Sequence, residues 1–247
     1  MLQRSSSDHL RYQTGRITCP WHGACFNACT GDVEDAPGLD GLHTYSTDVK
    51  DGKIFVTANL KTVTSKVGRS PIARAKAKKN RPAVTDQPKS SISPPDHETK
   101  NEKVVVVGGG SAGLHTIEAL REHGFEGQIT LISKENYVPI DRTKLSKALI
   151  TDAAKLAWRS ETELKDEFKV ELQLGVEVTK VDTQGKTVET NKGEKVSYDK
   201  LVLAPGSNTK KLPIDGVDLQ GIYTLRGLED TQAIVAGKLL SAALNRA

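Results

Sequence analysis

The sequence has no long hydrophobic run and no leader-like segment. No stretch of its 247 residues approaches 18 consecutive apolar residues, so we expect no membrane-spanning helix. The first residues, MLQRSSSDHLRYQTG, lack the apolar segment that a secretory signal requires. We therefore expect a protein that is not secreted.

Cysteine is also scarce. The three cysteines are Cys19, Cys25 and Cys29. An odd number of cysteines in a chain without an export signal argues against a disulfide framework. All three lie close to His22 in the stretch CPWHGACFNACTGD, which begins at residue 19. This clustering favours metal or redox chemistry over scattered buried thiols.

Acidic and aromatic residues are rare in one segment. Residues 61–100 contain ten Lys or Arg against three Asp or Glu, and they hold five of the ten prolines. Such a composition cannot bury enough apolar surface to offset the chain entropy lost on folding. We predict a disordered basic linker over residues 61–101. Because aromatic residues are not interleaved with its charges, the segment does not indicate a nucleic-acid partner.

Residues 1–60 form a small module that we predict to be rich in β-strands. The stretch TYSTDVKDGKIFVTA has two alternating runs on either side of Asp51 and Gly52. An Asp-Gly pair between such runs favours a tight hairpin turn.

Residues 102–247 form a larger module that opens with a β-α-β pattern. KVVVV (103–107) is a short apolar run typical of a buried parallel strand, and QITLIS (128–133) is a second one. Between them, apolar residues at helical spacing predict a helix that ends near Gly124. Further strands follow, with turns at Gln184-Gly185 and Lys192-Gly193, and LEDTQAIVAGKLLSAAL (228–244) is the last predicted helix.

The stretch VVVVGGGSAG carries a G-x-G-x-x-G pattern between the first predicted strand and the helix. In this context the pattern is a dinucleotide-binding fingerprint. Its glycines allow the tight turn, the approach of a pyrophosphate and the close packing of the helix, whose first N–H groups face the phosphates. An acidic residue at the end of the second strand is placed for a ribose. The predicted residues are Gly108, Gly110, Ser111, Ala112, Gly113 and Glu135.

The stretch YVPIDRTKLSKALI resembles the DRP-x-LSK segment of flavin-dependent reductases with the glutathione-reductase-like fold. The similarity is greatest to ferredoxin reductases of oxygenase systems and to apoptosis-inducing-factor-like proteins. The resemblance implies that Arg142 and Lys147 contact FAD, the lysine near the reactive end of the isoalloxazine. Thr143 departs from the proline of the family pattern.

A second stretch, YDKLVLAPGS, resembles the strand ending in ATG that passes under the flavin diphosphate in that family. The resemblance implies that Ala204 and Gly206 approach the cofactor, although Pro205 replaces the threonine. No dedicated catalytic acid or base is apparent, so we predict no catalytic residue. The family's second G-x-G-x-x-G, for NAD(P)H, does not follow AGK (236–238), so no site for NAD(P)H is expected here.

The stretch CPWHGACF resembles the second ligand box of a Rieske [2Fe–2S] domain. In such centres two cysteines hold one iron and two histidines hold the other. The resemblance implies that Cys19 and His22 are ligands. A Rieske module joined by a linker to an FAD module resembles the Rieske-containing apoptosis-inducing-factor-like flavoproteins.

The first ligand box, C-x-H, is absent, because no cysteine precedes Cys19. We favour a truncated form that keeps a Rieske-like fragment without a cluster. A zinc site made by Cys19, His22, Cys25 and Cys29 and a cluster completed by another chain remain open.

The combined prediction is an α/β, Rossmann-like FAD-binding domain, partial at 102–247, preceded by a partial all-β Rieske-like module at 1–60. The resemblance implies a flavoprotein oxidoreductase that moves electrons from NADH through FAD to a Rieske cluster, here truncated at both ends. A non-catalytic fragment that binds FAD or a partner protein is the alternative. The resemblance also implies a cytoplasmic or mitochondrial location and does not choose between the two. The electron acceptor is not predicted.

Overall fold

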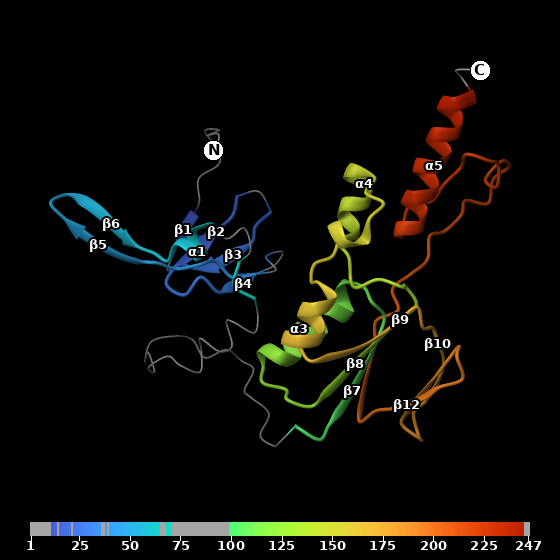
Figure 1. The fold of residues 1–247 in the computed structure, drawn as a ribbon, viewed down its shortest axis with the longest axis horizontal. Helices are drawn as coiled ribbons and strands as arrows, with labels where there is room; N and C mark the ends of the chain where they lie inside the picture. Colours follow the sequence, from blue (N-terminus) through green and yellow to red (C-terminus); the bar gives the residue numbers. More distant parts are fainter. Residues whose placement is uncertain are drawn as a thin grey trace. The chain divides into compact units, whose positions relative to one another are not determined.

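A computed structural model of the protein describes residues 11–13, 15–20, 22–35, 38, 40–64, 68–70 and 99–244. The chain divides into two compact units, the first largely within residues 1–92 and the second largely within residues 93–247. Figure 1 shows the first unit in blue to cyan and the second in green to red.

The first unit consists mainly of short antiparallel strands, as its alternating pattern predicts. A four-stranded sheet has the order β1-β2-β3-β4, and a separate hairpin pairs β5 with β6. At the hairpin turn, Asp51 and Gly52 have φ of 51° and 69°, which matches the tight turn that Asp-Gly favours. The strands are β1 (Arg11–Gln13), β2 (Arg16–Thr18), β3 (Cys25–Asn27), β4 (Val33–Asp35), β5 (Ser46–Lys50) and β6 (Lys53–Thr57).

The predicted linker falls largely outside the described residues, since residues 71–98 are not described. At its start, α1 (Leu60–Thr64) forms a short helix. Further on, the backbone N–H of Arg69 donates to the carbonyl of Gly41 at 2.7 Å, and the N–H of Gly41 donates back at 3.0 Å. Residues on both sides of position 60 thus belong to the same unit, and the predicted boundaries of the linker stay predictions.

The second unit is built on a four-stranded parallel sheet with the order β13-β7-β8-β9. The predicted strands at 103–107 and 128–133 are confirmed as β7 (Lys103–Val107) and β8 (Gln128–Ser133), and both are buried in their centres. They are joined by α3 (Ser111–Glu122), and Gly124, with φ of 87°, follows the helix end. The outer strands are β9 (Val170–Leu174) and β13 (Lys200–Leu203).

A smaller antiparallel sheet, β10-β11-β12, packs against the parallel sheet. Its strands are β10 (Val178–Asp182), β11 (Thr187–Thr190) and β12 (Lys195–Ser197). One apolar cluster joins Val105 and Ile132 of the parallel sheet to Val188 of β11 and to Tyr198. This cluster leaves the carboxyl ends of β7, β8 and β13 free to build a site.

Short helices and one long helix complete the second unit (Figure 1). Tyr137, Ile140, Leu145, Leu156 and Leu228 pack together in a second apolar cluster, which joins α4 and the segment after η2 to the start of α5. The prediction of a last helix over 228–244 is confirmed. The helices are η1 (Arg142–Lys144), α4 (Leu145–Ala148), η2 (Ala153–Lys155), η3 (Glu163–Glu167) and α5 (Leu228–Leu244).

Candidate functional site

A cavity of about 920 Å³ lies where β7, β8 and β13 end and α3 begins. Ligands of open parallel sheets bind at this place, outside the carboxyl ends of the strands. Its walls come from six segments of the second unit. The lining residues are 108–112, 133–135, 204–209 and 226–227, with Ile140, Arg142, Thr143, Trp158, Glu229 and Asp230.

The glycine loop forms one wall, and its glycines have different neighbours. Gly108 has a φ of 115°, and a Cβ there would overlap the carbonyl oxygen of Ala204. A Cβ on Gly113 would overlap the carbonyl oxygen of Gly108, so this glycine lets α3 pack against the loop. A Cβ on Gly110 would meet no atom within 4 Å. The backbone at Gly110 therefore stays open to a ligand.

Ser111 and Ala112 line the cavity as the first residues of α3. The first N–H groups of a helix have no carbonyl partner within the helix, and they carry the positive end of its dipole. A diphosphate is the kind of ligand that this wall suits best.

Ser133 also lines the cavity, and the sequence interpretation missed it. Its side chain is 1% exposed, and its Oγ has no hydrogen-bond partner among the described residues. A Cβ on Gly109 would overlap this oxygen, so the hydroxyl lies directly beneath the glycine loop. The sequence did offer a reason to predict Ser133. It is the last residue of β8 and stands two positions before Glu135, and residues two apart in an extended chain point to the same side.

Glu135 and Arg142, both predicted cofactor contacts, are bound to each other. Arg142 Nη2 lies 2.7 Å from each carboxylate oxygen of Glu135. The hydroxyl of Tyr137 donates to the same carboxylate at 3.0 Å. Burial and the charge of Glu135 raise the pKa of Tyr137 above its usual value. The tyrosine therefore stays protonated and donates to Glu135 over the whole physiological pH range.

The turn before α5 and the start of this helix form another wall, which the sequence interpretation also missed. Asp230 Oδ2 accepts from the backbone N–H of Arg226 at 2.6 Å and of Gly227 at 2.8 Å. Arg226 Nε donates to the carbonyl of Ser207 at 3.0 Å. The acidic residues in the first turn of the helix were a readable signal for Asp230. No local sequence pattern predicts that Arg226 belongs to the site. Its carbonyl accepts a hydrogen bond from Nη1 of Arg142 at 3.0 Å, although the two residues are 84 positions apart.

The other predicted residues divide into two groups. Ala204 and Gly206 line the cavity, and Gly206 has a φ of 72°. Lys147 is exposed on α4 and is not among the residues that line the cavity. The structure thus brings Ala204 and Gly206 to the glycine loop and leaves Lys147 away from it.

The residues of the cavity fit FAD. The open backbone at Gly110 and the start of α3 suit a diphosphate, and the orphaned hydroxyl of Ser133 leaves a polar atom beneath the loop. The carboxylate of Glu135 suits a ribose. A volume of about 920 Å³ is at the upper end of common ligand pockets, as a dinucleotide requires.

The first unit places Cys19 and His22 in one tight loop. The N–H of Cys19 donates to the carbonyl of Ala24 at 2.8 Å, and the N–H of Gly23 donates to the carbonyl of Cys19 at 3.0 Å. Gly23 has a φ of 77°, which its missing Cβ allows. This loop has the compactness that a pair of metal ligands needs.

The described residues do not complete a metal site. Among them, no group of three or more His, Cys, Asp or Glu side chains lies together. Cys25 is buried against Thr18, with Sγ 3.2 Å from its Oγ1, and Cys29 is exposed. Cys19 and His22, the predicted ligands, would account for two of the four protein ligands that a Rieske centre requires. The described residues thus lack the ligands for a complete [2Fe–2S] cluster, and they do not support the predicted alternative of a zinc site.

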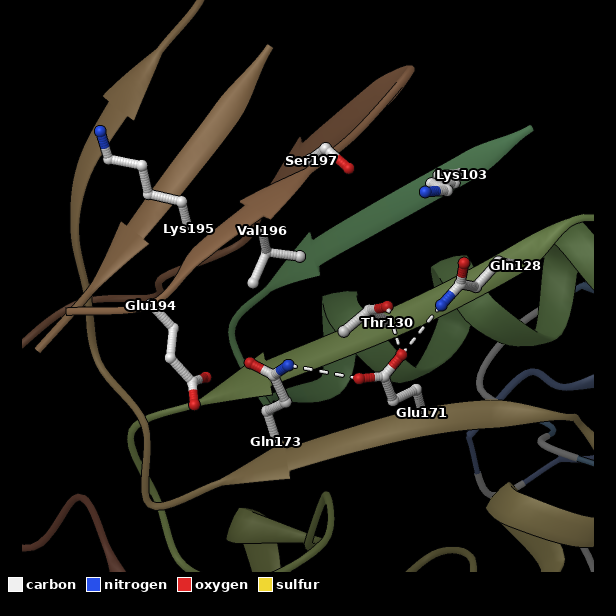
Figure 2. Close-up of a pocket in the computed structure, with 9 residues that line it drawn as sticks. All are labelled: Lys103, Gln128, Thr130, Glu171, Gln173, Glu194, Lys195, Val196 and Ser197. Carbon is white, nitrogen blue, oxygen red and sulfur yellow. Dashed lines mark hydrogen bonds between the residues drawn. The ribbon is translucent and has the colours of Figure 1, made fainter. Parts of the chain in front are cut away.

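A second hollow of about 490 Å³ lies on the polar face of the parallel sheet, where Glu171 is central. Figure 2 shows Gln128 and Thr130 directed to its carboxylate, at 2.9 Å and 3.3 Å, and Gln173 at 3.3 Å. None of the predicted site residues lines it.

No helix in the described part of the chain has both the length and the apolar character to cross a bilayer.

Comparison with known families yields two matches. The Rieske [2Fe-2S] domain family matches residues 3–46. The pyridine nucleotide-disulphide oxidoreductase family matches residues 102–244, which contain the whole cavity. FAD and NAD(P)H are the cofactors of the second family, and a [2Fe–2S] cluster is that of the first.

Two curated relatives are similar over different spans. Apoptosis-inducing factor 3 of Homo sapiens is 37% identical over 90% of this chain. The ferredoxin–NAD(+) reductase subunit of a benzene 1,2-dioxygenase system in Pseudomonas putida is 39% identical over 53% of it. The chain spans about a third of the length of these relatives, 34% and 32%.

A solved structure of putidaredoxin reductase, in covalent complex with putidaredoxin, has a TM-score of 0.51 and 31% identity to this chain. It covers 57% of this chain, which itself covers 34% of that one. Together with the match over residues 102–244, the glycine loop and the cavity at the strand ends give the family. The chain belongs to the pyridine nucleotide-disulphide oxidoreductase family.

Proposed function

We propose that this chain carries a Rieske-like module and the FAD-binding region of an NAD(P)H-dependent flavoprotein oxidoreductase. The observation that carries the proposal is the cavity itself, in which an open glycine loop, a helix start and the carboxylate of Glu135 converge. The names of the relatives, which include ferredoxin–NAD(+) reductase and rubredoxin–NAD(+) reductase, support electron flow from a nicotinamide to an iron protein.

In this proposal the residues of the chain bind and orient FAD. The backbone at Gly108 and Gly110, with the first turn of α3, holds the diphosphate. Glu135 accepts from the ribose hydroxyl groups, and Arg142 keeps its carboxylate in place. Ala204 and Gly206 bring β13 close beneath the diphosphate.

When bound, FAD supplies the chemistry, because it accepts a hydride and releases electrons one at a time. The protein contributes position and electrostatics, and we assign no side chain as catalytic acid or base. Lys147 keeps its proposed place near the flavin through the resemblance alone, since it is exposed on α4.

Cys19 and His22 are the proposed cluster ligands of the Rieske-like module. Because the described residues offer no third ligand, we derive no electron-transfer step through a cluster. A ferredoxin-type acceptor and a cytoplasmic or mitochondrial location belong to the same proposal.

A second candidate is a flavin-binding chain without turnover. The chain covers 34% of apoptosis-inducing factor 3, so the turnover of the whole relative is itself a proposal for this chain. Such a chain would bind FAD in the same cavity, and NADH would not reduce the flavin.

The test is an absorption spectrum of the purified chain, with iron and zinc analysis of the same sample. Flavin bands that persist through gel filtration support the FAD site, and bleaching by NADH separates the oxidoreductase from the second candidate. Iron with a Rieske-type spectrum supports ligation by Cys19 and His22. A colourless protein that takes up no added FAD contradicts the proposed function.

A further inference from the structure

Trp158 is the one aromatic residue among those that line the glycine-loop cavity. It is half-buried and follows η2 in the stretch AWRS. The other lining residues are mostly glycines, small polar residues and charged residues, with Ile140 as the one large aliphatic side chain. Trp158 lies outside the glycine pattern and outside the stretches that resemble flavin-dependent reductases.

The position of Trp158 is set by backbone pairing and by α3. Its N–H donates to the carbonyl of Pro139 at 3.2 Å, and the adjacent Ala157 forms a β-bridge with Ile140. The indole meets the ring of His115 edge-on, with centroids 5.6 Å apart and planes at 86°. His115 itself lies on α3, where Nδ1 is 2.8 Å from the carbonyl oxygen of Ser111.

The next residue, Arg159, anchors the same segment to α3 a second time. Its Nε lies 2.8 Å from Glu118 Oε1, and both side chains are buried, at 3% and 6% exposure. Glu118 is three positions after His115, so two neighbouring residues of the segment contact one face of the helix. This double attachment holds the indole in a fixed place at the cavity.

FAD has two flat aromatic ring systems, adenine and isoalloxazine, and stacking on an aromatic side chain stabilises such a ring in a binding site. The glycine loop, Glu135 and Arg142 address only the polar part of such a ligand. We propose that Trp158 is a positioning residue that stacks against one of the two rings of the bound dinucleotide. This inference rests on the proposed FAD site, and it adds a side chain that contacts one of the aromatic rings of FAD.

The experiment compares FAD binding by the unchanged full chain, Trp158→Leu and Trp158→Phe. Leucine keeps apolar bulk without an aromatic face, and phenylalanine keeps the face. We expect Trp158→Leu to weaken FAD binding about tenfold, within the range found for loss of aromatic–base stacking, and Trp158→Phe to stay within about threefold of the unchanged chain. Equal FAD affinity in all three proteins would overturn the inference and leave the proposed FAD site intact.

Competition with FMN and with ADP identifies the ring. If Trp158→Leu weakens only FMN, the indole stacks on isoalloxazine, and if it weakens only ADP, the indole stacks on adenine. Either result supports the inference. Equal weakening of both, with a lower unfolding midpoint, means a loosened fold and overturns it.

Fluorescence gives a second readout. The chain has two tryptophans, so Trp21→Phe leaves Trp158 as the single tryptophan, and excitation of the indole alone reports on it. Stacking on isoalloxazine predicts strong quenching of this emission on titration with FMN, and stacking on adenine predicts a change with ADP. Emission that responds to neither compound contradicts the inference. Failure of the unchanged chain to take up any FAD removes both the proposed function and this inference.

Discussion

Arg142 Nη2 lies 2.7 Å from both carboxylate oxygens of Glu135, and its Nη1 donates to the carbonyl of Arg226 at 3.0 Å. One guanidinium thus joins the end of β8, η1 and the turn before α5, which form three sides of the cavity. Because the two side chains of the ion pair are only 24% and 23% exposed, they are partly shielded from water. The arginine orders the site before a ligand enters it.

Replacement of Arg142 by Gln is expected to weaken FAD binding about tenfold, because Glu135 loses its cation and its fixed orientation. Arg142→Lys keeps the charge but cannot reproduce the planar guanidinium, so an intermediate loss is expected. FAD titration of the purified variants measures both. Lys144→Gln, which removes a more exposed cation 3.3 Å from Asp141, is the matched control and should bind FAD normally. Tighter FAD binding by Arg142→Gln would mean that the ion pair blocks the site.

The raised pKa of Tyr137 leads us to expect that the folded protein loses stability at alkaline pH. Burial and the neighbouring Glu135 raise its pKa in the folded state above the value near 10 of an unfolded tyrosine. Its contribution is therefore fully present below about pH 10 and is lost as the pH rises toward the folded pKa. Above about pH 10 the free energy of unfolding should fall by at most about 1.4 kcal/mol for each pH unit, because one proton is involved.

Urea unfolding of the unchanged chain and of Tyr137→Phe between pH 8 and pH 11 measures this effect. The variant should lose about 1 kcal/mol at pH 8, through the missing hydrogen bond to Glu135, and should then decline less steeply above pH 10. Tyr223→Phe, at a residue 44% exposed, is the control and should keep the slope of the unchanged chain. Identical slopes for the unchanged chain and Tyr137→Phe would refute the prediction.

Two glycines of the loop should separate folding from binding. Gly113→Ala places a methyl group on the carbonyl oxygen of Gly108, so the second unit should lose about 2 kcal/mol of stability. Gly110→Ala places the methyl group where no atom lies within 4 Å, so the fold should persist while the diphosphate is displaced. Thermal unfolding and FAD retention by the two variants check this contrast. The reverse order, with Gly110→Ala unstable and Gly113→Ala unaffected, would exclude these roles.

The buried pair of Arg159 and Glu118 should matter far more to stability than an exposed pair. Glu118→Ala leaves a guanidinium 3% exposed without this carboxylate, and the expected cost is about 3 to 5 kcal/mol. Glu161→Ala removes the exposed partner of Lys165 and should cost no more than about 0.5 kcal/mol. Urea unfolding at neutral pH compares the two variants. Similar losses in both would show that burial of the pair contributes little.

Local pattern in the sequence determined most of the elements. The valine run of β7, the spacing of apolar residues in α3, and the Asp-Gly turn between β5 and β6 all lie where their residues predict them. Each of these depends on neighbours within a few positions, through strand burial, helical periodicity or turn chemistry. The glycine pattern likewise placed the predicted dinucleotide loop, because a strand, a turn and a helix follow one another directly there.

The tertiary structure alone decided which side chains share the cavity. Trp158, Arg226 and Ser133 come from segments far apart in the chain. Strand β13 also lies far from β7 in the sequence, and it joins β7 through a parallel pairing that runs from Lys200 with Val104 to Leu203 with Val107. The same folding left Lys147 exposed on α4, outside the lining of the cavity. Local propensity carries no information on such long-range contacts, since they form when apolar clusters bring distant elements together. The sequence by itself therefore predicted the class of ligand, and the packing of the second unit determined which residues line the cavity.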